Sequence, residues 1–518
     1  MSAQSSFYVT TPIYYVNDEP HIGHAYTTVL ADVISRFHRL SGQETFFLTG
    51  TDEHGQKVLT AARARGVDPQ EHCDEMVQRF QRLWERLEIR NDDFIRTTEE
   101  RHERVVLDFV RRIDAAGDIY DATYEGWYCI PDERFWTEKD LLAGGNCPLC
   151  ERPTTKLTER NYFFRMSRYQ DWLIEHIRSN PEFLQPESRR NEILGFLRKP
   201  LGDLCITRPK SRLGWGVPFP LDEEYVIYVW LDALVNYYSA VVDRKRPDGS
   251  PWWPADLHLI GKDILTTHAV YWPTMLKSAG LPIPRTILAH GWWLVEETKM
   301  SKSLGNVVKP ISMADRYGHD AFRYFLMRDM VLGQDAGFSE ESLVGRINSD
   351  LANDLGNCLN RVERMIDKHC ARTVPEPGAS GAEEQELERI GRRTAEAVPA
   401  LIGELKLHAA IEETLQMVRA TNRYLEVKAP WKAVKEGGTA AVASTLWFST
   451  EAIRLAASLL SPVMPAKCGE ALHRLGVLED PAELVSRPLR ADQIGWGLLE
   501  PGTEIRPGAP LFPRIEQT

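Results

Sequence analysis

The chain has 518 residues, which is too long for one compact core, so two to four domains are expected. Its hydrophobic content of 43% and charged content of 26% are ordinary for a globular protein, and no stretch reaches the roughly 18 uninterrupted apolar residues of a membrane helix. The net charge of −12, from 62 basic and 74 acidic side chains, argues against wholesale non-specific nucleic-acid binding but permits a local basic surface.

The first residues and the cysteines indicate the cellular setting. The N-terminal MSAQSSFYV has no basic segment and no apolar segment, so a secretory signal is not expected. The eight cysteines are irregularly spaced in a long chain and do not suggest a disulfide framework. We therefore expect a cytoplasmic protein without membrane segments.

The beginning of the chain predicts a strand, a helix and a second strand. Residues 7–11 (FYVTT) are typical of a short buried strand that ends at Pro12. Apolar residues then recur at three- and four-residue steps, which predicts a helix from near His21 to Gly42. Residues 44–50 (ETFFLTG) are the second strand. This crossover is the start of a parallel nucleotide-binding sheet.

The remainder of the chain changes its pattern twice. Residues from about 116 to 215 are rich in aromatic residues, Gly and Pro and interrupt the α/β pattern, which then resumes at 223–230, 255–263 and 285–291. From about residue 345 onward, helical periodicity dominates and strand patterns vanish. We expect a split α/β domain with an inserted module, followed by an antiparallel helix bundle.

The tetrapeptide His21-Ile22-Gly23-His24 lies where the first strand passes into the first helix. A helix N-terminus offers unpaired N–H groups and a partial positive charge, which favour phosphate. Gly23 lets a nucleotide lie against the backbone, and the two imidazoles can donate to oxygens of one phosphoryl group. On its own the motif is weak, because two histidines at a helix start more often cap the helix than take part in catalysis.

A second motif, Lys299-Met300-Ser301-Lys302-Ser303, follows the last predicted strand of the split domain. Two ammonium groups on a Ser/Gly loop can follow the β- and γ-phosphates of a triphosphate and neutralise charge as pyrophosphate leaves. A solvated basic turn is the alternative for this loop in isolation.

Together the two motifs resemble the class I aminoacyl-tRNA synthetases, and the surrounding segments are similar to the methionyl-tRNA synthetase family. The similar segments are TTPIYYVNDEPHIGH (10–24), FLTGTDEHG (47–55), NYFFRMS (161–167), VWLDALVNY (229–237), IGKDILTTHAVYWP (260–273) and LFPRIE (511–516). The resemblance implies activation of methionine by ATP to methionyl-adenylate and pyrophosphate. The methionyl group then passes to the 3'-terminal ribose of tRNA(Met), for translation initiation and elongation.

The resemblance also implies roles for individual residues in binding ATP and in catalysis. His21 and His24 would meet the α-phosphate region, and Lys302, assisted by Lys299, the leaving phosphates. Gly23, Gly261 and Asp263 would contact ATP together with Lys302, and Mg²⁺ is expected to accompany ATP.

For methionine, the resemblance implies that Asp52 pairs with the α-ammonium group. It assigns the thioether pocket to Ile13, Tyr15, Trp230, Ala233, Leu234, Tyr237, Ile264 and His268. We expect Tyr237 to be the weak donor to the sulfur. Homocysteine should be the most difficult competitor, because a missing methylene is worth only about 1–3 kcal/mol in such a pocket.

A metal site is expected in the inserted module, where the family presents two C-x-x-C pairs. The second pair, Cys147 and Cys150, is intact, but the first reads Cys129-Ile130-Pro131-Asp132. Three thiolates and one carboxylate can form a tetrahedral Zn²⁺ site. A degenerate knuckle that folds without metal is the alternative.

In the family, the helix bundle reads the anticodon, and the resemblance implies this role for Asn357, Arg361 and Trp431. Hydrogen bonds to base edges and stacking on aromatic planes are how single-stranded bases are recognised. Arg361 could equally be a solvated helix residue and Trp431 a core residue. Some family members carry a further dimerising domain, and this sequence ends just after LFPRIE, so a monomer is expected.

The predicted fold class is α/β, with a split Rossmann-like parallel sheet, an inserted zinc-knuckle-type module and an all-α helix bundle. The expected division is 1–115 for the first half of the Rossmann catalytic domain, 116–215 for the inserted connective module, 216–299 for the second half, 300–345 for the KMSKS loop and stem-contact link, 346–500 for the anticodon-binding bundle and 501–518 for a C-terminal tail.

Two rival interpretations remain. One is a catalytically silent paralogue that only binds tRNA. Loss of a histidine or a lysine from the two motifs would have supported it, but both motifs are whole. A related nucleotidyl transferase that activates a small molecule without RNA would have no reason to carry the long helical region.

Overall fold

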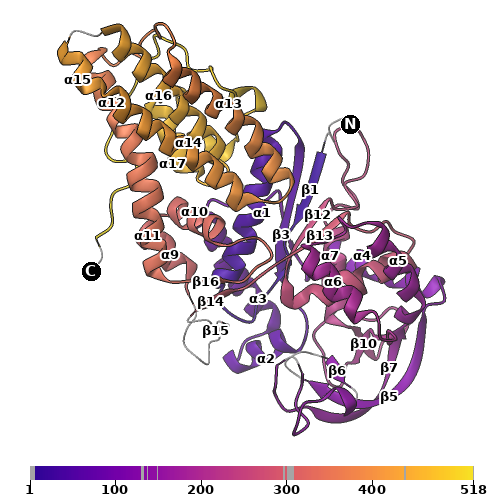
Figure 1. Cartoon of the computed structure of the whole chain (residues 1–518). Coiled ribbons are helices and arrows are strands. Elements are labelled where there is room, and N and C mark those ends of the chain that lie inside the picture. The colour runs from indigo at the N-terminus through magenta and orange to yellow at the C-terminus, as the bar shows by residue number, and fades with distance from the viewer. Residues whose placement is uncertain are drawn as a thin grey trace.

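The computed structural model describes residues 6–129, 134–136, 138–148, 150–295, 298–299, 308–436 and 439–516 (Figure 1). Its centre is a seven-stranded parallel sheet in the order β2-β3-β1-β12-β13-β8, with β4 also paired to β3. Its strands are β1 (Ser6–Thr10), β2 (Tyr14–Tyr15), β3 (Glu44–Asp52), β4 (Asp93–Arg96), β8 (Leu184–Gln185), β12 (Leu257–Gly261) and β13 (Thr286–His290). The predicted α/β fold class with a split parallel sheet is confirmed.

The two halves of this sheet meet at β1 and β12, where Val9 pairs with Leu257 and Thr10 with His258. From β1 the chain continues to β3 on one side, and from β12 it continues to β13 on the other. The strand order therefore reverses between β1 and β12. In parallel sheets, ligands bind at such a switch point, outside the carboxyl ends of the strands.

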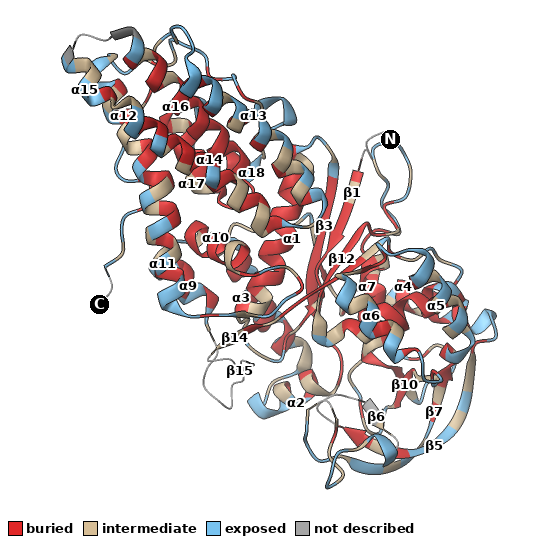
Figure 2. Cartoon of the chain, in the orientation of Figure 1, coloured by how far each residue is buried: buried red, intermediate tan, exposed pale blue. Residues whose placement is uncertain are grey.

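The helix α1 (Ile22–Leu40) connects β1 to β3, as the sequence predicts. It ends just before Gly42, whose φ of 83° is a left-handed conformation that glycine adopts without strain. Figure 2 shows α1 buried along nearly its whole length, because the sheet covers one side of it and the helix bundle the other.

The other helices of the catalytic region cover both faces of the sheet. Those of the first half are α2 (Gln56–Arg65), α3 (Pro69–Arg86) and α4 (Glu100–Ala115). Those of the second half are α7 (Val229–Ser239), a 3-10 turn η3 (Lys262–Ile264), a π-helical turn η4 (Thr267–Tyr271) and α8 (Trp272–Ser278). Helices α1 and α3 share one hydrophobic core with the bundle, whereas α4, α7 and α8 share the core on the opposite face.

The inserted region forms an antiparallel sheet in the order β6-β5-β7-β9, with two helices beside it. Its elements are β5 (Ile119–Cys129), β6 (Arg134–Trp136), η1 (Glu138–Asp140), β7 (Thr155–Phe164), η2 (Met166–Tyr169), α5 (Gln170–Ser179), α6 (Glu187–Phe196) and β9 (Leu204–Cys205). It also supplies β8, which pairs with β13 at the edge of the central sheet. The insertion is therefore bound to the catalytic sheet by backbone hydrogen bonds.

One predicted strand lies outside the central sheet. Residues 223–230 contain β11 (Tyr225–Ile227), which pairs in antiparallel orientation with β10 (Thr207–Pro209) and leads directly into α7. The predicted strand that leads into a helix is therefore present, but this strand does not belong to the central sheet. Its uniformly apolar character indicates burial, and burial alone does not identify the strand with which it pairs.

A second small sheet leads from the catalytic region toward the bundle. It consists of β14 (Trp293–Val295), β15 (Thr298–Lys299) and β16 (Ala336–Gly337), with β14 in the middle. The helices α9 (Pro310–Tyr317) and α10 (His319–Asp329) lie between β15 and β16 in sequence. From Glu340 to His369 the chain is helical throughout, as α11 (Glu340–Arg346), the π-helical segment η6 (Ile347–Gly356) and α12 (Asn357–His369).

In the part of the chain that the structure describes, no named strand follows β16, so the predicted helix bundle is present. Its further elements are α13 (Ala382–Gly403), α14 (Leu407–Lys428), α15 (Pro430–Ala433), η7 (Val434–Glu436), α16 (Thr439–Leu460), α17 (Pro465–Arg474), α18 (Glu483–Ser486) and η8 (Ala491–Gln493). A search of the described residues finds no helix with the length and apolar character needed to span a membrane.

A buried ionic cluster joins α1 to the bundle. Asp32 of α1 accepts hydrogen bonds from Arg36 Nε at 2.8 Å and from Arg323 Nη2 of α10 at 2.6 Å. The two guanidinium groups also donate to the carbonyl oxygens of Leu484 and Val463 in the bundle, each at 2.9 Å. Because the buried charges are paired and hydrogen-bonded, the cluster fixes the bundle against α1.

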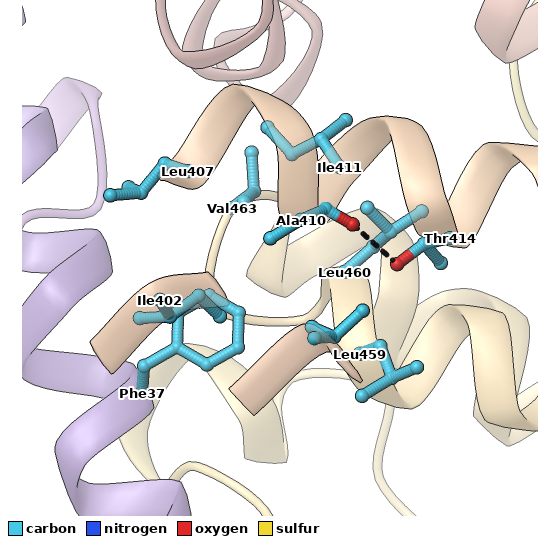
Figure 3. Close-up of a pocket in the computed structure, with 10 residues that line it drawn as sticks. Phe37, Ile402, Leu407, Ala410, Ile411, Thr414, Leu459, Leu460 and Val463 are labelled. Carbon is cyan, nitrogen blue, oxygen red and sulfur yellow. Dashed lines mark hydrogen bonds between the residues drawn. The ribbon is translucent and has the colours of Figure 1, made fainter. Parts of the chain in front are cut away.

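A small apolar cavity lies next to this junction (Figure 3). Phe37 of α1 lines it together with residues of the bundle, which are Val398, Ile402, Leu407, Ala410, Ile411, Thr414, Leu459, Leu460 and Val463. The Phe37 ring is therefore the contribution of the catalytic region to an interface made otherwise by the bundle.

We predict that Phe37→Ala lowers the free energy of unfolding by about 3–5 kcal/mol, because it removes a buried ring and enlarges an existing void. Urea denaturation of the variant and the wild type measures this difference. Phe196→Ala is the matched control, since Phe196 is 41% exposed and its removal should change stability by less than about 0.5 kcal/mol. Equal effects of the two substitutions would contradict the prediction.

Candidate active site

The two histidines of the HIGH motif cap the N-terminus of α1. Each of them accepts one backbone hydrogen bond through a ring nitrogen. His21 Nδ1 accepts a hydrogen bond from the Gly23 N–H, and His24 Nδ1 accepts one from the His21 N–H, both at 3.1 Å. In each ring the proton is therefore on Nε2. Burial, reinforced by the neighbouring His21, lowers the pKa of His24 well below its usual value. The cap therefore leaves each of the two rings with one N–H, on Nε2.

Two glycines make room for site side chains. A Cβ on Gly23 would lie 2.9 Å from Cε1 of His21, and a Cβ on Gly261 would lie 2.6 Å from Oδ1 of Asp263. Gly261 ends β12, so Asp263 follows β12 as His21 follows β1. Asp263 Oδ1 also accepts a hydrogen bond from Trp292 Nε1 at 3.3 Å. The HIGH motif and the IGKD loop (residues 260–263) therefore follow β1 and β12, the two strands at which the order of the sheet reverses.

The segment that leads to the KMSKS motif also lies against α1. The ring of Trp293 in β14 packs edge-on against Tyr26 of α1, with 6.1 Å between the ring centroids. At the end of β13, Nε2 of His290 and Oγ1 of Thr27 share a 2.7 Å hydrogen bond. In β15, Lys299 pairs through its backbone with Leu294 of β14. Residues 300–307, with Lys302, lie outside the described residues.

The residues expected to bind methionine come from five elements, β2, β3, α7, η3 and η4, and from the loop before β2. Tyr15 of β2 is the register partner of Asp52 at the end of β3, and Asp52 is 3% exposed. Trp230 of α7 lies between two other rings, with centroids 6.4 Å from Tyr15 and 6.4 Å from His268. The remaining residues of the set, Ile13, Ala233, Leu234, Tyr237 and Ile264, belong to α7 or pack against the same hydrophobic core.

Hydrogen bonds fix the protonation of His268. Its Nδ1 donates to the carbonyl oxygen of Ile264 at 2.9 Å, so Nε2 must accept the 2.8 Å hydrogen bond from the Tyr237 hydroxyl. Burial lowers the pKa of His268 to about 4, so the ring is neutral near pH 7. The hydroxyl proton of Tyr237 is therefore engaged by His268, and a thioether sulfur would compete for it.

We predict that this buried neutral ring makes the protein sensitive to acid. The ordinary pKa of histidine is 6.5, so between pH 6.5 and 4 the unfolded chain binds a proton at residue 268 that the folded chain does not. Stability that is present above pH 6.5 is lost as the pH falls toward 4. In His268→Gln, whose amide oxygen still accepts from Tyr237, thermal melting should decline less steeply over this range. Parallel curves for variant and wild type would refute the prediction.

The site also contains polar residues to which the sequence assigned no role. His54 Nδ1 and His102 Nε2 lie 2.7 Å and 2.9 Å from the two carboxylate oxygens of Asp232. His258 Nδ1 lies 2.7 Å from the hydroxyl of Thr10. His54 and Asp232 lie within the segments 47–55 and 229–237, so their position in segments that resemble the family could have identified them. His102 lies outside every such segment.

Three cysteines of the inserted region converge although they are distant in sequence. The sulfur atoms of Cys129, Cys147 and Cys150 lie within 4.8 Å of one another, and Cys129 and Cys147 are buried. None of the three forms a disulfide. Three thiols at this spacing are a donor set that suits Zn²⁺. Asp132, the expected fourth ligand, lies outside the described residues.

The residues expected to read an anticodon share one exposed surface of the bundle. Asn357 is exposed in the first turn of α12, and Arg361 follows one turn later. The Arg361 guanidinium carbon lies 5.1 Å from the centroid of the Trp431 ring, and Trp431 is 38% exposed on α15. Trp431 is therefore not a core residue, and its ring forms a platform with Arg361.

Comparisons with known proteins agree with this architecture. The family described as tRNA synthetases class I (M) matches residues 7–158 and 151–363, and the anticodon binding domain of methionyl tRNA ligase matches residues 374–518. The methionine–tRNA ligase of Thermotoga maritima is 46% identical over 98% of this chain and 80% of its own length. That of Synechocystis is 44% identical over 99% of this chain and 98% of its own length.

Solved structures give the same result. The Mycobacterium tuberculosis methionyl-tRNA synthetase in complex with methionyl-adenylate superposes with a TM-score of 0.93, at 42% identity, over 99% of this chain and all of that one. The free-state structure of the Mycobacterium tuberculosis enzyme gives a TM-score of 0.86 at 39% identity, over all of both chains.

The split parallel sheet, the HIGH cap at its switch point and the helical C-terminal region define a class I aminoacyl-tRNA synthetase. The matches over the whole chain narrow this class further. The chain belongs to the methionyl-tRNA synthetase family, the methionine–tRNA ligases, as the sequence motifs predicted.

Proposed function

We propose that this chain forms methionyl-adenylate and pyrophosphate from methionine and ATP in the crevice between β1 and β12. It then transfers the methionyl group to the 3'-terminal ribose of tRNA(Met), for initiation and elongation. The observation that carries the proposal is the pairing of β1 with β12, which brings the HIGH cap, the IGKD loop and the aromatic residues around Asp52 to one edge of the sheet. The similarity to a solved synthetase in complex with methionyl-adenylate supports it.

In the first step, the carboxylate of methionine attacks the α-phosphorus of ATP in line, and pyrophosphate leaves. The substrate supplies the nucleophile, so the protein contributes positioning and charge stabilisation rather than a base. The Nε2–H groups of His21 and His24, which the cap leaves protonated, would donate to oxygens of the α-phosphate region. Lys302, with Lys299, would neutralise the departing phosphates, which Mg²⁺ would accompany.

The two substrates would be held by different surfaces. Gly23, Gly261 and Asp263 would receive ATP, since a Cβ on either glycine would crowd the neighbouring site side chain. Asp52, buried beside Tyr15, would pair with the α-ammonium group of methionine. The thioether would lie among Ile13, Tyr15, Trp230, Ala233, Leu234, Tyr237, Ile264 and His268. The neutral state of His268 suits an apolar side chain.

The bundle would bind the anticodon of tRNA(Met). Asn357 offers an amide to base edges, and the stacked pair of Arg361 and Trp431 offers a flat surface to an unstacked base. The division at 1–115, 116–215, 216–299, 300–345, 346–500 and 501–518 is part of this proposal. We also propose a monomer in the cytoplasm, as the sequence leads us to expect.

ATP–pyrophosphate exchange with a panel of amino acids tests the function, and we predict exchange that depends on methionine. Lys302→Ala should slow it by about a hundredfold or more with little change in KM for methionine, because its ammonium acts on the departing phosphates. Lys309→Ala is the control, since Lys309 lies in the same region and its side chain is 72% exposed. Stronger exchange with another amino acid would refute methionine as the substrate. Exchange at the wild-type rate in Lys302→Ala would refute the role of Lys302.

The cysteine cluster would hold one Zn²⁺, with Asp132 as the fourth ligand, and stabilise the inserted module. We predict about one zinc ion per chain by elemental analysis of the purified protein. Cys147→Ser should lose the metal and lower the melting temperature, whereas Cys205→Ser, which is outside the cluster, should keep it. Zinc-free protein with an unchanged melting temperature would support the degenerate knuckle instead.

A further inference from the structure

A buried hydrogen-bonded cluster lies behind the residues proposed to bind methionine. Asp232 of α7 is 1% exposed, and its two oxygens lie 2.7 Å from His54 Nδ1 and 2.9 Å from His102 Nε2. His54 follows Asp52 by two residues at the end of β3, and His102 belongs to α4, which packs beside α7 (Figure 1). One carboxylate therefore joins three separate elements.

The helix α7 carries two stripes of side chains with helical spacing. The first stripe is proposed to face methionine and consists of Trp230, Ala233, Leu234 and Tyr237. The second consists of Asp232, Asn236 and Ser239, and all three are buried. Residues two positions apart on a helix differ by about 200° around its axis, so the second stripe is on the opposite side. Bonds to the second stripe therefore fix the rotation of α7, and with it the orientation of the first.

The His102 contact of this carboxylate is supported by a further residue of α7, Ser239. Ser239 Oγ donates to the carbonyl oxygen of Asn236 at 3.1 Å and lies 2.8 Å from His102 Nδ1. The His102 contact thus stays within the packing of α4 against α7. The His54 contact, by contrast, reaches from α7 to the segment that carries Asp52.

Electrostatics make the contact between Asp232 and His54 strong. Burial by itself would raise the pKa of Asp232, but His54 and His102 more than offset this and lower it to about 2. Burial disfavours the charged form of His54, yet Asp232 raises the pKa of His54 above its usual value. The hydrogen bond is therefore charge-assisted, and removal of one partner would leave a buried charge without its counterion.

We propose that Asp232 is a positioning residue for methionine, which holds the end of β3 with Asp52 at a fixed distance from the pocket side of α7 through His54. The inference rests on the proposed function, in which Asp52 meets the α-ammonium group and α7 meets the side chain. An amino acid that uses both surfaces binds well only when their spacing is fixed. ATP is proposed to contact neither surface, so its binding does not depend on this spacing.

The chain offers a matched pair of variants at His54. The Asn amide nitrogen superposes on the Nδ1 position of histidine, so His54→Asn keeps a donor to Asp232. The Gln amide nitrogen reaches the Nε2 position instead, so His54→Gln loses that donor. Both variants remove the imidazole, and they differ in the one hydrogen bond that the proposal requires.

The experiment is ATP–pyrophosphate exchange at varied methionine and at varied ATP. We predict that Asp232→Asn and His54→Gln raise KM for methionine by about tenfold or more, with KM for ATP within about twofold of wild type. His54→Asn should recover most of the loss. The double variant of Asp232→Asn and His54→Gln should be no worse than the more affected single variant, because both remove one interaction.

The control for a purely structural role is His102→Asn, which shortens the side chain on the other oxygen of Asp232. It should lower the melting temperature and raise KM for methionine less than His54→Gln does, because His102 lies within the packing of α4 against α7 and does not reach the segment that carries Asp52. If Asp232→Asn does not fold, the comparison of the two His54 variants tests the proposal, because Asp232 retains its hydrogen bond to His102 in both. The inference is overturned if His54→Gln and His54→Asn have the same KM for methionine, or if KM for ATP rises in parallel. Absence of exchange with methionine in the wild type would instead refute the proposed function.

Discussion

The catalytic region depends on the backbone pairing between β1 and β12. These strands belong to the two halves of the split sheet, and only their pairing brings the HIGH cap and the IGKD loop to one edge. The strand order reverses at this point, so no crossover covers the carboxyl ends of the two strands. The position of the HIGH cap and the IGKD loop at this edge is thus a consequence of topology, because each of them follows one of these strands.

The helix α1 connects this edge of the sheet to the helix bundle. Its first turn contains His24, and farther along it Asp32 and Arg36 are bonded within the interface to the bundle. Phe37 continues the same contact into the apolar core that α1 shares with the bundle (Figure 3). The element that presents the HIGH histidines is therefore held at its other end by the region that resembles an anticodon-binding domain.

The pKa values of the buried histidines of the catalytic region are shifted in two opposite directions. Burial lowers the pKa of His24, His258, His268 and His290, which leaves neutral rings with defined donors and acceptors. His54 is the contrast, because the carboxylate of Asp232 raises its pKa despite burial. A lowered pKa leaves the imidazole ring neutral, with one donor and one acceptor nitrogen, whereas the pairing of His54 with Asp232 suits a fixed joint between elements.

The sequence by itself determined the family, the strand–helix–strand opening and the all-helical C-terminal region. These are local properties, because motifs and periodicity are read within a few residues of one another. Only the tertiary structure decided that β11 pairs outside the central sheet, that β8 of the insertion extends that sheet, and that His54 and His102 meet on Asp232. Apolar periodicity records that a residue is buried but not which distant residue it contacts, and a hydrogen bond across 178 positions has no local signature.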